Sequence, residues 1–265
     1  MRTISRYGWI GYTAARSNLA YRFEVVFRSI FLAVILYIFM RLWTIVYTDS
    51  ENGRIAGLTL PQMLWYLVIT EAVFMSAPRI WAEVDQDVRT GRLAVQLIRP
   101  LSYTAGHLSH AMGERVVRLG INLIVGAVIA LLLVGPIPLT LTGLAMFAVV
   151  LPVAFVLDFL GMFLVGLSAF WLESAAGLAL IYLRCVMMLG GMFLPLEIYP
   201  DALQPALRIL PFASMVSAPG RMFVDPSFTL LKESLITQGA AVVAFAALVA
   251  TVQLIAFRRL FANGG

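Results

Sequence analysis

The chain of 265 residues carries 61% hydrophobic and only 12% charged residues, and its mean hydropathy is +0.92. A soluble domain carries about 45–50% apolar and about 25% charged residues, so this composition excludes a soluble globular domain and, because apolar burial is abundant, a disordered chain. The formal net charge of +5 indicates membrane topology rather than nucleic-acid binding, because the arginines cluster at the ends of long apolar runs.

The long apolar runs are the main structural signal in the sequence. Six of them can cross about 30 Å of hydrocarbon, and their continuity over about 20 residues differs from the alternating pattern of membrane-barrel strands. We expect an all-α integral membrane protein with a single domain over residues 1–265. Its six transmembrane helices are predicted at residues 27–47, 59–79, 116–136, 142–170, 175–195 and 235–257.

The segment before the first span, residues 1–24, is predicted to be a helix lying in the cytoplasmic membrane interface. Apolar side chains such as Ile4 and Tyr12 recur at helical spacing opposite Arg6 and Arg16. An apolar stripe with a basic opposite face is typical of an interfacial helix. The residues that weaken this stripe are Gly8 and Gly11.

The distribution of basic residues predicts the orientation in the membrane. With a cytoplasmic N-terminus, most arginines lie on the inner side, and the basic residues left outside are Arg54, Arg208, Arg221 and Lys232. This is the positive-inside bias of multi-pass proteins. An even number of spans then places the C-terminus in the cytoplasm too. We therefore expect a multi-pass protein of the cell (inner or plasma) membrane.

Residues 80–115 form the only sizeable loop predicted on the cytoplasmic side. Acidic residues open it, Gly91 provides a turn, apolar residues follow, and Pro100 ends the pattern, as in a short amphipathic helix. A solvated linker is the alternative, but apolar side chains among charges of both signs favour docking of a soluble partner. The residues expected to couple this loop to the partner are Glu83, Asp85, Asp87, Arg89, Gly91, Arg92, Leu93, Leu97 and Pro100.

This loop resembles a motif of the type-2 permeases of ATP-binding-cassette (ABC) exporters, the branch that exports drugs, polysaccharides and lipids. The family pattern G-T-L-E-x-L-L-x-x-P-L lies between spans two and three, and it is matched without a gap by Gly91, Leu93, Leu97, Pro100 and Leu101. The sequence departs from the pattern at Ala94, where many members carry glutamate, and at Gln96, where many carry leucine. The charged residues expected to contact an ATPase are therefore Asp87, Arg89 and Arg92.

A second resemblance lies after the fifth predicted span. Residues 190–211 resemble the family pattern G-x-x-x-P-x-x-x-x-P-x-x-L-x-x-L-x-x-x-P. In the family this segment forms short re-entrant helices on the external side, and the resemblance implies the same for residues 196–234. Prolines suit such breaks, which are tolerated where protein or water satisfies the freed backbone groups. The residues that mark the segment are Gly191, Pro195, Pro200 and Pro211.

Together these resemblances cover the chain and imply a function. The chain would be the permease subunit of an ATP-driven exporter, and a dimer with a second permease, identical or different, would form the translocation path. The cytoplasmic ABC ATPase dimer would be a separate partner, because no G-x-x-x-x-G-K-[ST] nucleotide motif occurs in this sequence. We therefore expect no catalytic residue and no cofactor in this chain, ATP and magnesium on the ATPase, contacts with membrane lipids, and no nucleic-acid partner.

Charged residues within the predicted spans are costly in hydrocarbon and are therefore candidates for the translocation path. Those that lie well away from the span ends are Arg41, Glu71, Asp158 and Arg184. Because intramembrane charges usually pair, we expect an Asp158–Arg184 pair between spans four and five and a Glu71–Arg41 pair between spans one and two. An ion-coupled secondary transporter that uses these charges is an alternative, although the repeat found in such transporters is not evident.

The two histidines, His107 and His110, share one helical face with Glu114 at a spacing that metal ligands use. A membrane metalloenzyme built on these three residues is a further alternative. We expect no metal site, because polar residues are ordinary at the inner mouth of a span and a catalytic zinc ion needs an open position beside three protein ligands. Whether the assembly serves bulk export, self-protection or signalling is left open, as is the substrate.

Overall fold

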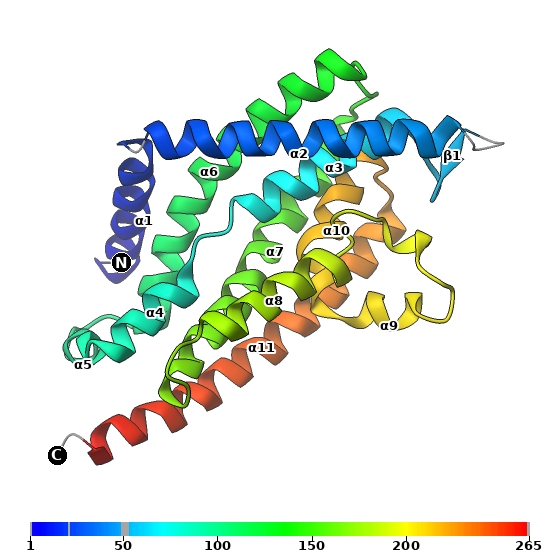
Figure 1. Cartoon of the computed structure of the whole chain (residues 1–265). Coiled ribbons are helices and arrows are strands. Elements are labelled where there is room, and N and C mark those ends of the chain that lie inside the picture. The colour runs from blue at the N-terminus through cyan, green and yellow to red at the C-terminus, as the bar shows by residue number, and fades with distance from the viewer. Residues whose placement is uncertain (1, 21, 49–52, 264–265) are drawn as a thin grey trace.

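The computed structural model describes residues 2–20, 22–48 and 53–263, and most of them lie in helices (Figure 1). Two short strands, β1 (Arg54–Ile55) and β2 (Leu58–Thr59), pair antiparallel. The α-helices are α1 (Arg2–Ala20), α2 (Arg22–Thr48), α3 (Leu60–Met75), α4 (Ile80–Arg89), α5 (Arg92–Leu97), α6 (Tyr103–Leu133), α7 (Leu141–Leu167), α8 (Ala176–Leu189), α9 (Gln204–Ile209), α10 (Pro211–Val224) and α11 (Phe228–Asn263). Two 3₁₀ helices are η1 (Ser168–Phe170) and η2 (Leu196–Ile198).

Five of the six predicted spans correspond to helices that are long and apolar enough to cross a membrane. They cover Ile30–Thr48, Leu60–Arg89, Tyr103–Leu133, Leu141–Phe170 and Phe228–Arg258. The remaining predicted span, residues 175–195, is represented by α8, which has 14 residues. At 1.5 Å per residue such a helix is about 21 Å long, which is less than the hydrocarbon thickness of about 30 Å. The chain is therefore an all-α membrane protein in which α8 is a short apolar helix.

The core lies around α3 and α7. In the span windows that include these two helices, 67% and 61% of the residues are buried, whereas the corresponding shares are 22% for α2 and 11% for α11. Aliphatic and aromatic side chains of α3 and α7 pack against α6, α10 and α11. The exposed apolar faces of α2 and α11 are consequently the surfaces left for lipid or for another protein chain.

The two ends of the bundle differ in what they carry. The start of α1, the end of α11, and the helices α4 and α5 lie at one end, whereas the β1–β2 pair and α9 lie at the opposite end (Figure 1). We call the first the α4–α5 end and the second the β1–β2 end. The helix α1 crosses the bundle at the α4–α5 end, at a large angle to α2 (Figure 1). This placement suits a helix lying along a membrane face.

The loop predicted over residues 80–115 is largely helical. It contains α4, α5 and the first turns of α6, which begins at Tyr103 rather than near residue 116. Ser102 is the N-cap of α6, and its side-chain oxygen accepts a hydrogen bond from the Ala105 backbone N–H. Serine is a preferred N-cap residue, so the predicted boundary was wrong because it followed hydropathy and ignored this start signal.

Two glycines allow α1 to pack closely on α6. A Cβ atom on Gly113 would overlap the backbone of Gly11, and a Cβ on Gly11 would lie 3.0 Å from the Ser109 carbonyl oxygen. Gly11 interrupts the apolar stripe of α1 in the sequence, and the structure supplies the reason, because the helix backbones meet there. Small residues permit such close approach between helices in membranes.

Replacing Gly113 by alanine should destabilise the protein by about 1–3 kcal/mol, because the added methyl group forces α1 away from α6. Gly8→Ala is the matched control, because a Cβ on Gly8 meets nothing within 4 Å, and alanine favours a helix by up to about 1 kcal/mol over glycine. The thermal unfolding midpoint (Tm) of each purified variant in detergent would show the difference. Equal midpoints for the two variants would contradict the close α1–α6 contact.

Prolines divide the segment between α8 and α11 into short helices. Pro195 precedes η2, Pro205 lies in the first turn of α9, and Pro211 begins α10. Proline is well tolerated at the first turn of a helix, where its missing N–H would have no helical partner. The helix α10 then packs against α3 and α7, and most of its residues are buried. The segment therefore folds back into the bundle instead of remaining an open loop.

Candidate functional site

The helices α4 and α5, with the short stretch that follows them, form a compact unit at one end of the bundle, which we call the α4–α5 unit (residues 80–100). Gly91 connects them with φ of +70°, a left-handed conformation that glycine adopts without strain. Val84 and Leu93 are fully buried, and Val84 lies against Gly166 of α7, where a Cβ atom would overlap it. The amphipathic helix predicted here is thus anchored on its apolar side to α7.

Asp87 holds the α4–α5 unit together. Its Oδ2 atom accepts hydrogen bonds from Gln96 Nε2 at 2.7 Å and from the Tyr103 hydroxyl at 3.1 Å. His107 Nε2 lies 3.4 Å from the same oxygen, and Arg92 Nε lies 3.6 Å from Oδ1. The carboxylate thereby joins α4, α5 and α6. Asp87 is only 4% exposed, so its side chain is turned inward instead of toward a partner.

Asp85 has a similar internal role. Its Oδ1 atom accepts a hydrogen bond from the Ala175 backbone N–H at 2.8 Å, and its Oδ2 atom lies 3.6 Å from Arg89 Nη1. Ala175 immediately precedes α8, so Asp85 ties α4 to the start of the short apolar helix. Both aspartates predicted to couple the loop to a partner are therefore buried, and they fix the geometry of the unit.

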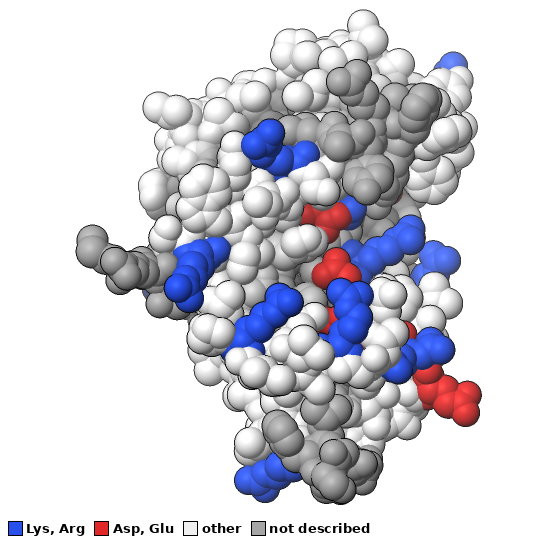
Figure 2. Space-filling view, turned by 90° about the vertical axis from the view of Figure 1, so that its left-hand side faces the viewer, with Lys and Arg blue, Asp and Glu red and all other residues white. Residues whose placement is uncertain are grey.

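Basic and apolar side chains form the exposed face of the α4–α5 unit. The Arg89 and Arg92 side chains are 59% and 62% exposed, and Val95 and Ile98 are 60% and 83% exposed. Leu97 is half-buried and Pro100 is exposed. Figure 2 shows that basic side chains gather on this end of the molecule, with acidic ones between them. The face thus offers a soluble partner both cationic and apolar side chains.

A buried ion pair joins α6 to α7 in the middle of the protein. Arg115 Nη1 lies 2.6 Å from Asp158 Oδ2, and the two side chains are 3% and 8% exposed. Arg115 also donates to Ser76 Oγ and to the Val73 carbonyl oxygen at the end of α3. Its guanidinium group lies 4.0 Å from the centre of the Phe155 ring. One arginine therefore holds three spans together.

The predicted Asp158–Arg184 pair is wrong, because Asp158 pairs with Arg115 instead. Arg184 lies on the exposed face of α8, where its Nη1 atom is 3.5 Å from Met187 Sδ. In the sequence alone, Arg115 is a topology signal at the inner boundary of the third predicted span. Because α6 begins at Tyr103, Arg115 lies inside the bundle. The sequence signal that could have revealed this is Ser102, which caps the start of α6.

The predicted Glu71–Arg41 pair is also absent from the ion pairs of the described residues. Glu71 lies on α3 and is 1% exposed, and its Oε1 atom has no hydrogen-bond partner in the part of the chain that the structure describes. Arg41 is exposed on α2, where its Nε atom donates to the Tyr37 hydroxyl at 3.1 Å. The two side chains lie in different surroundings: Glu71 is buried in the bundle, whereas α2 carries Arg41 on its outer face.

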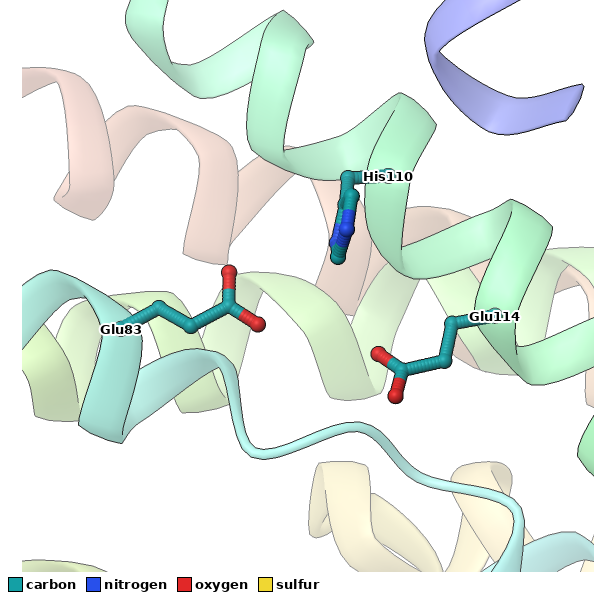
Figure 3. Close-up of side chains that lie close together, drawn as sticks. All are labelled: Glu83, His110 and Glu114. Atoms are coloured by element: carbon teal, nitrogen blue, oxygen red, sulfur yellow. The ribbon is translucent and has the colours of Figure 1, made fainter. Parts of the chain in front are cut away.

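The histidines of α6 lie next to α4. His107 Nδ1 is 3.3 Å from Glu83 Oε2. Glu83, His110 and Glu114 bring one ligand atom each to within 4.8 Å of one another (Figure 3). The three residues could together hold a divalent cation. The sequence alone suggested His107, His110 and Glu114 as this group, and the structure replaces His107 by Glu83 from the neighbouring helix.

The motif residues after α8 organise the β1–β2 end of the bundle. Gly191 has φ of +72° and its carbonyl oxygen accepts a hydrogen bond from the Tyr66 hydroxyl. Pro195 and Pro200 flank η2, and burial raises the pKa of Tyr199, whose hydroxyl donates to the Met188 carbonyl oxygen at 2.6 Å. The motif thus fixes the turn after α8.

Arg221 of α10 is a second structural arginine that the sequence argument missed. It is 7% exposed, lies 2.6 Å from Glu197 Oε2, and donates to the Ala56 carbonyl oxygen at 2.9 Å. It also lines a polar cavity of about 150 Å³ with Ser214, Ser217 and Thr237, among other residues. From the sequence, Arg221 is placed only on the outer side of the membrane. Its partner Glu197 is not evident, because a basic residue near a proline-rich segment gives no information on which acidic residue it pairs with.

Comparison with known protein families gives one match, and it covers almost the whole chain. Residues 24–264 match the model of the ABC-2 family transporter protein. No curated protein matches the sequence significantly. The family match agrees with the all-α membrane fold and its long apolar helices. The chain therefore belongs to the ABC-2 transporter family and is a multi-pass membrane permease subunit of an ABC transporter, which works with an ABC ATPase partner.

Proposed function

We propose that this permease subunit is part of an exporter and that its ATPase docks on the exposed face of the α4–α5 unit. In this arrangement α4, α5 and both termini lie in the cytoplasm, and ATP and magnesium are bound by the separate ATPase. Two permease subunits, identical or different, form the translocation path. The basic residues at the α4–α5 end support this orientation, because cytoplasmic ends of membrane proteins are enriched in arginine.

The observation that carries the proposal is the combination of an exposed docking face with rigid internal connections. The exposed face carries Arg89, Arg92, Val95 and Ile98. Behind it, Asp87 connects the unit to Gln96 and to Tyr103 of α6. A solvated linker would need neither feature, since its charged side chains would be satisfied by water.

The internal connections explain how a partner's motion could reach the spans. Asp87 links the unit to α6, Asp85 links it to the residue before α8, and Val84 packs against α7. A displacement of α4 would therefore be transmitted at once to two spans, α6 and α7, and to the short helix α8. An ATPase that binds two arrangements of the unit with different affinity would shift the permease between them, whereas equal affinity would shift nothing.

The exposed faces of the spans favour an apolar or amphiphilic substrate. Large apolar side chains cover the outer faces of α2 and α8, including Phe31, Ile38, Leu180 and Ile181. On α8, Arg184 lies among them and is exposed. A translocation path between two subunits lined by such faces would accept molecules with an apolar body, and Arg184 would favour those with an anionic group.

Co-purification from native membranes in mild detergent tests the docking face. We expect an ABC ATPase to accompany the wild-type protein and to be lost from Ile98→Asp, because a charge replaces the most exposed apolar side chain of the unit. Ile209→Asp is the matched control, since Ile209 is 81% exposed on α9 at the β1–β2 end. Retention of the ATPase by Ile98→Asp, or equal loss from both variants, would contradict docking at the α4–α5 unit.

A further inference from the structure

Two helices contribute to an unassigned cluster of ligand-type side chains. His110 and Glu114 lie one turn apart on α6, and Glu83 faces them from α4 (Figure 3). One ligand atom from each residue lies within 4.8 Å of the other two. The cluster is close to the α4–α5 unit, but neither its packing nor the docking face requires it.

An unpartnered nitrogen shows that the cluster is incomplete as it stands. His110 Nδ1 is buried and has no hydrogen-bond partner among the described residues. A buried polar atom without a partner is costly, and most such atoms in folded proteins are satisfied by protein, water or an ion. A ligand that accepts the lone pair of an imidazole nitrogen would remove this cost.

A cavity gives access to the cluster from the end of the bundle. It has a volume of about 310 Å³ and is lined by Glu83 and His110, together with His107, Arg99 and Tyr103. The Glu83 side chain is 38% exposed, so it can rotate toward α6. This space would admit a hydrated ion, because a single water molecule occupies only about 30 Å³ in the liquid.

Neighbouring side chains orient two of the three ligands. His107 Nδ1 lies 3.3 Å from Glu83 Oε2. Arg118 pairs with Glu114 Oε1 and donates from its Nε atom to Asn18 Oδ1 of α1 at 3.0 Å. Such outer partners fix the direction of metal ligands. Arg118 pairs with Oε1 of Glu114, so Oε2 of the same carboxylate remains available to bind a cation.

We propose that Glu83, His110 and Glu114 bind a zinc ion that joins α4 to α6. Zinc accepts imidazole nitrogen and carboxylate oxygen, and the two carboxylates balance its charge. Ligands about 2.0–2.2 Å from one ion lie no more than about 4.4 Å apart, so a small inward rotation of Glu83 closes the site. Water occupies the fourth position from the cavity.

Bound zinc would restrain the movement of α4 relative to α6. This consequence rests on the proposed function, in which α4 moves with the ATPase. Zinc is then an inhibitor of coupling that acts from the cytoplasmic side, because the ion links α4 directly to a span. Zinc binding itself depends only on the three side chains and can be measured without the ATPase.

The binding test uses the full-length permease in detergent, freed of metal and carrying no polyhistidine tag. Isothermal titration with Zn²⁺ should give one ion per chain for the wild type. His110→Ala and Glu83→Gln should each lower the affinity at least about 10-fold, because even outer-shell substitutions cost about 10–100-fold. Glu233→Gln is the matched control, since Glu233 is an exposed acid on α11, and it should bind as the wild type does.

The proposal is overturned if the wild type binds no zinc, or if His110→Ala and Glu83→Gln bind it as tightly as Glu233→Gln. If His110→Ala fails to fold, Glu83→Gln still tests the site. Glu83 is partly exposed and lies at the cavity, so its substitution should leave the fold intact. Zinc-dependent loss of ATPase activity in the wild-type complex but not in His110→Ala would support the inhibitory role. Zinc binding without that loss would overturn the inhibition and leave the site standing.

Discussion

Arg115→Ala should cause the largest loss of stability of any single substitution considered for this protein. The change leaves Asp158 buried without its cation and removes the hydrogen bonds that Arg115 donates to Ser76 and Val73. Breaking a buried ion pair on one side costs about 3–5 kcal/mol, because the remaining charge is uncompensated. For a chain of this size the Tm should fall by about 6–20 °C.

Two controls make this test specific for the pair. Arg184→Ala removes an arginine from an apolar helix where the side chain is exposed, so the free energy of unfolding should change by no more than about 0.5 kcal/mol. The double variant Arg115→Met, Asp158→Leu should regain much of the loss, since apolar residues of similar size can replace a buried pair. If Arg184→Ala lowers the Tm as much as Arg115→Ala does, the ion pair has been assigned to the wrong arginine.

Among substitutions of buried residues, Asp87→Ala should have the largest effect on partner binding. The substitution leaves Gln96 and the Tyr103 hydroxyl without their shared acceptor, and an unsatisfied buried polar group costs about 1–3 kcal/mol. The helix α5 then loses its attachment to α4, and an ATPase would have to restore it on binding. The affinity of the ATPase for the permease should therefore fall by about 5- to 150-fold, which corresponds to a coupling free energy of about 1–3 kcal/mol.

The affinity of the co-purified ATPase for the permease in lipid nanodiscs measures this effect. Gln86→Ala is the matched control, because Gln86 lies on the same helix and is exposed. The Tm of Asp87→Ala should fall far less than that of Arg115→Ala, since Asp87 holds a short helix at the end of the bundle. Wild-type affinity in Asp87→Ala would show that α5 needs no internal support for docking.

The spans were predictable because their signal is local. Runs such as residues 142–170 contain enough apolar residues to cross a bilayer whatever surrounds them, and the corresponding helix covers Leu141–Phe170. The start of α6 was not predicted, because residues 103–115 mix polar and apolar side chains and hydropathy treats them as a loop. Their helical structure depends on the Ser102 cap and on packing against α1, where the backbones meet at Gly113.

The candidate site was predictable in position but not in the role of each residue. Gly91 and Pro100 mark the turn and the end of the α4–α5 unit by their backbone preferences, which are properties of single residues. Whether Asp87 faces a partner or the protein interior depends on the direction from which α6 brings Tyr103. That direction is set by contacts between residues far apart in the sequence.

By itself, the sequence determined the membrane environment, the approximate spans, the family resemblance and the position of the α4–α5 unit. Only the tertiary structure decided that Asp158 meets Arg115, that Arg184 remains on an exposed face, and that Glu83 joins His110 and Glu114. The physical reason is that hydropathy measures how a segment partitions into lipid but contains no information on its rotation about the helix axis or its depth relative to its neighbours. Charge pairing depends on both, because an ion pair forms only when two side chains from different helices reach the same point.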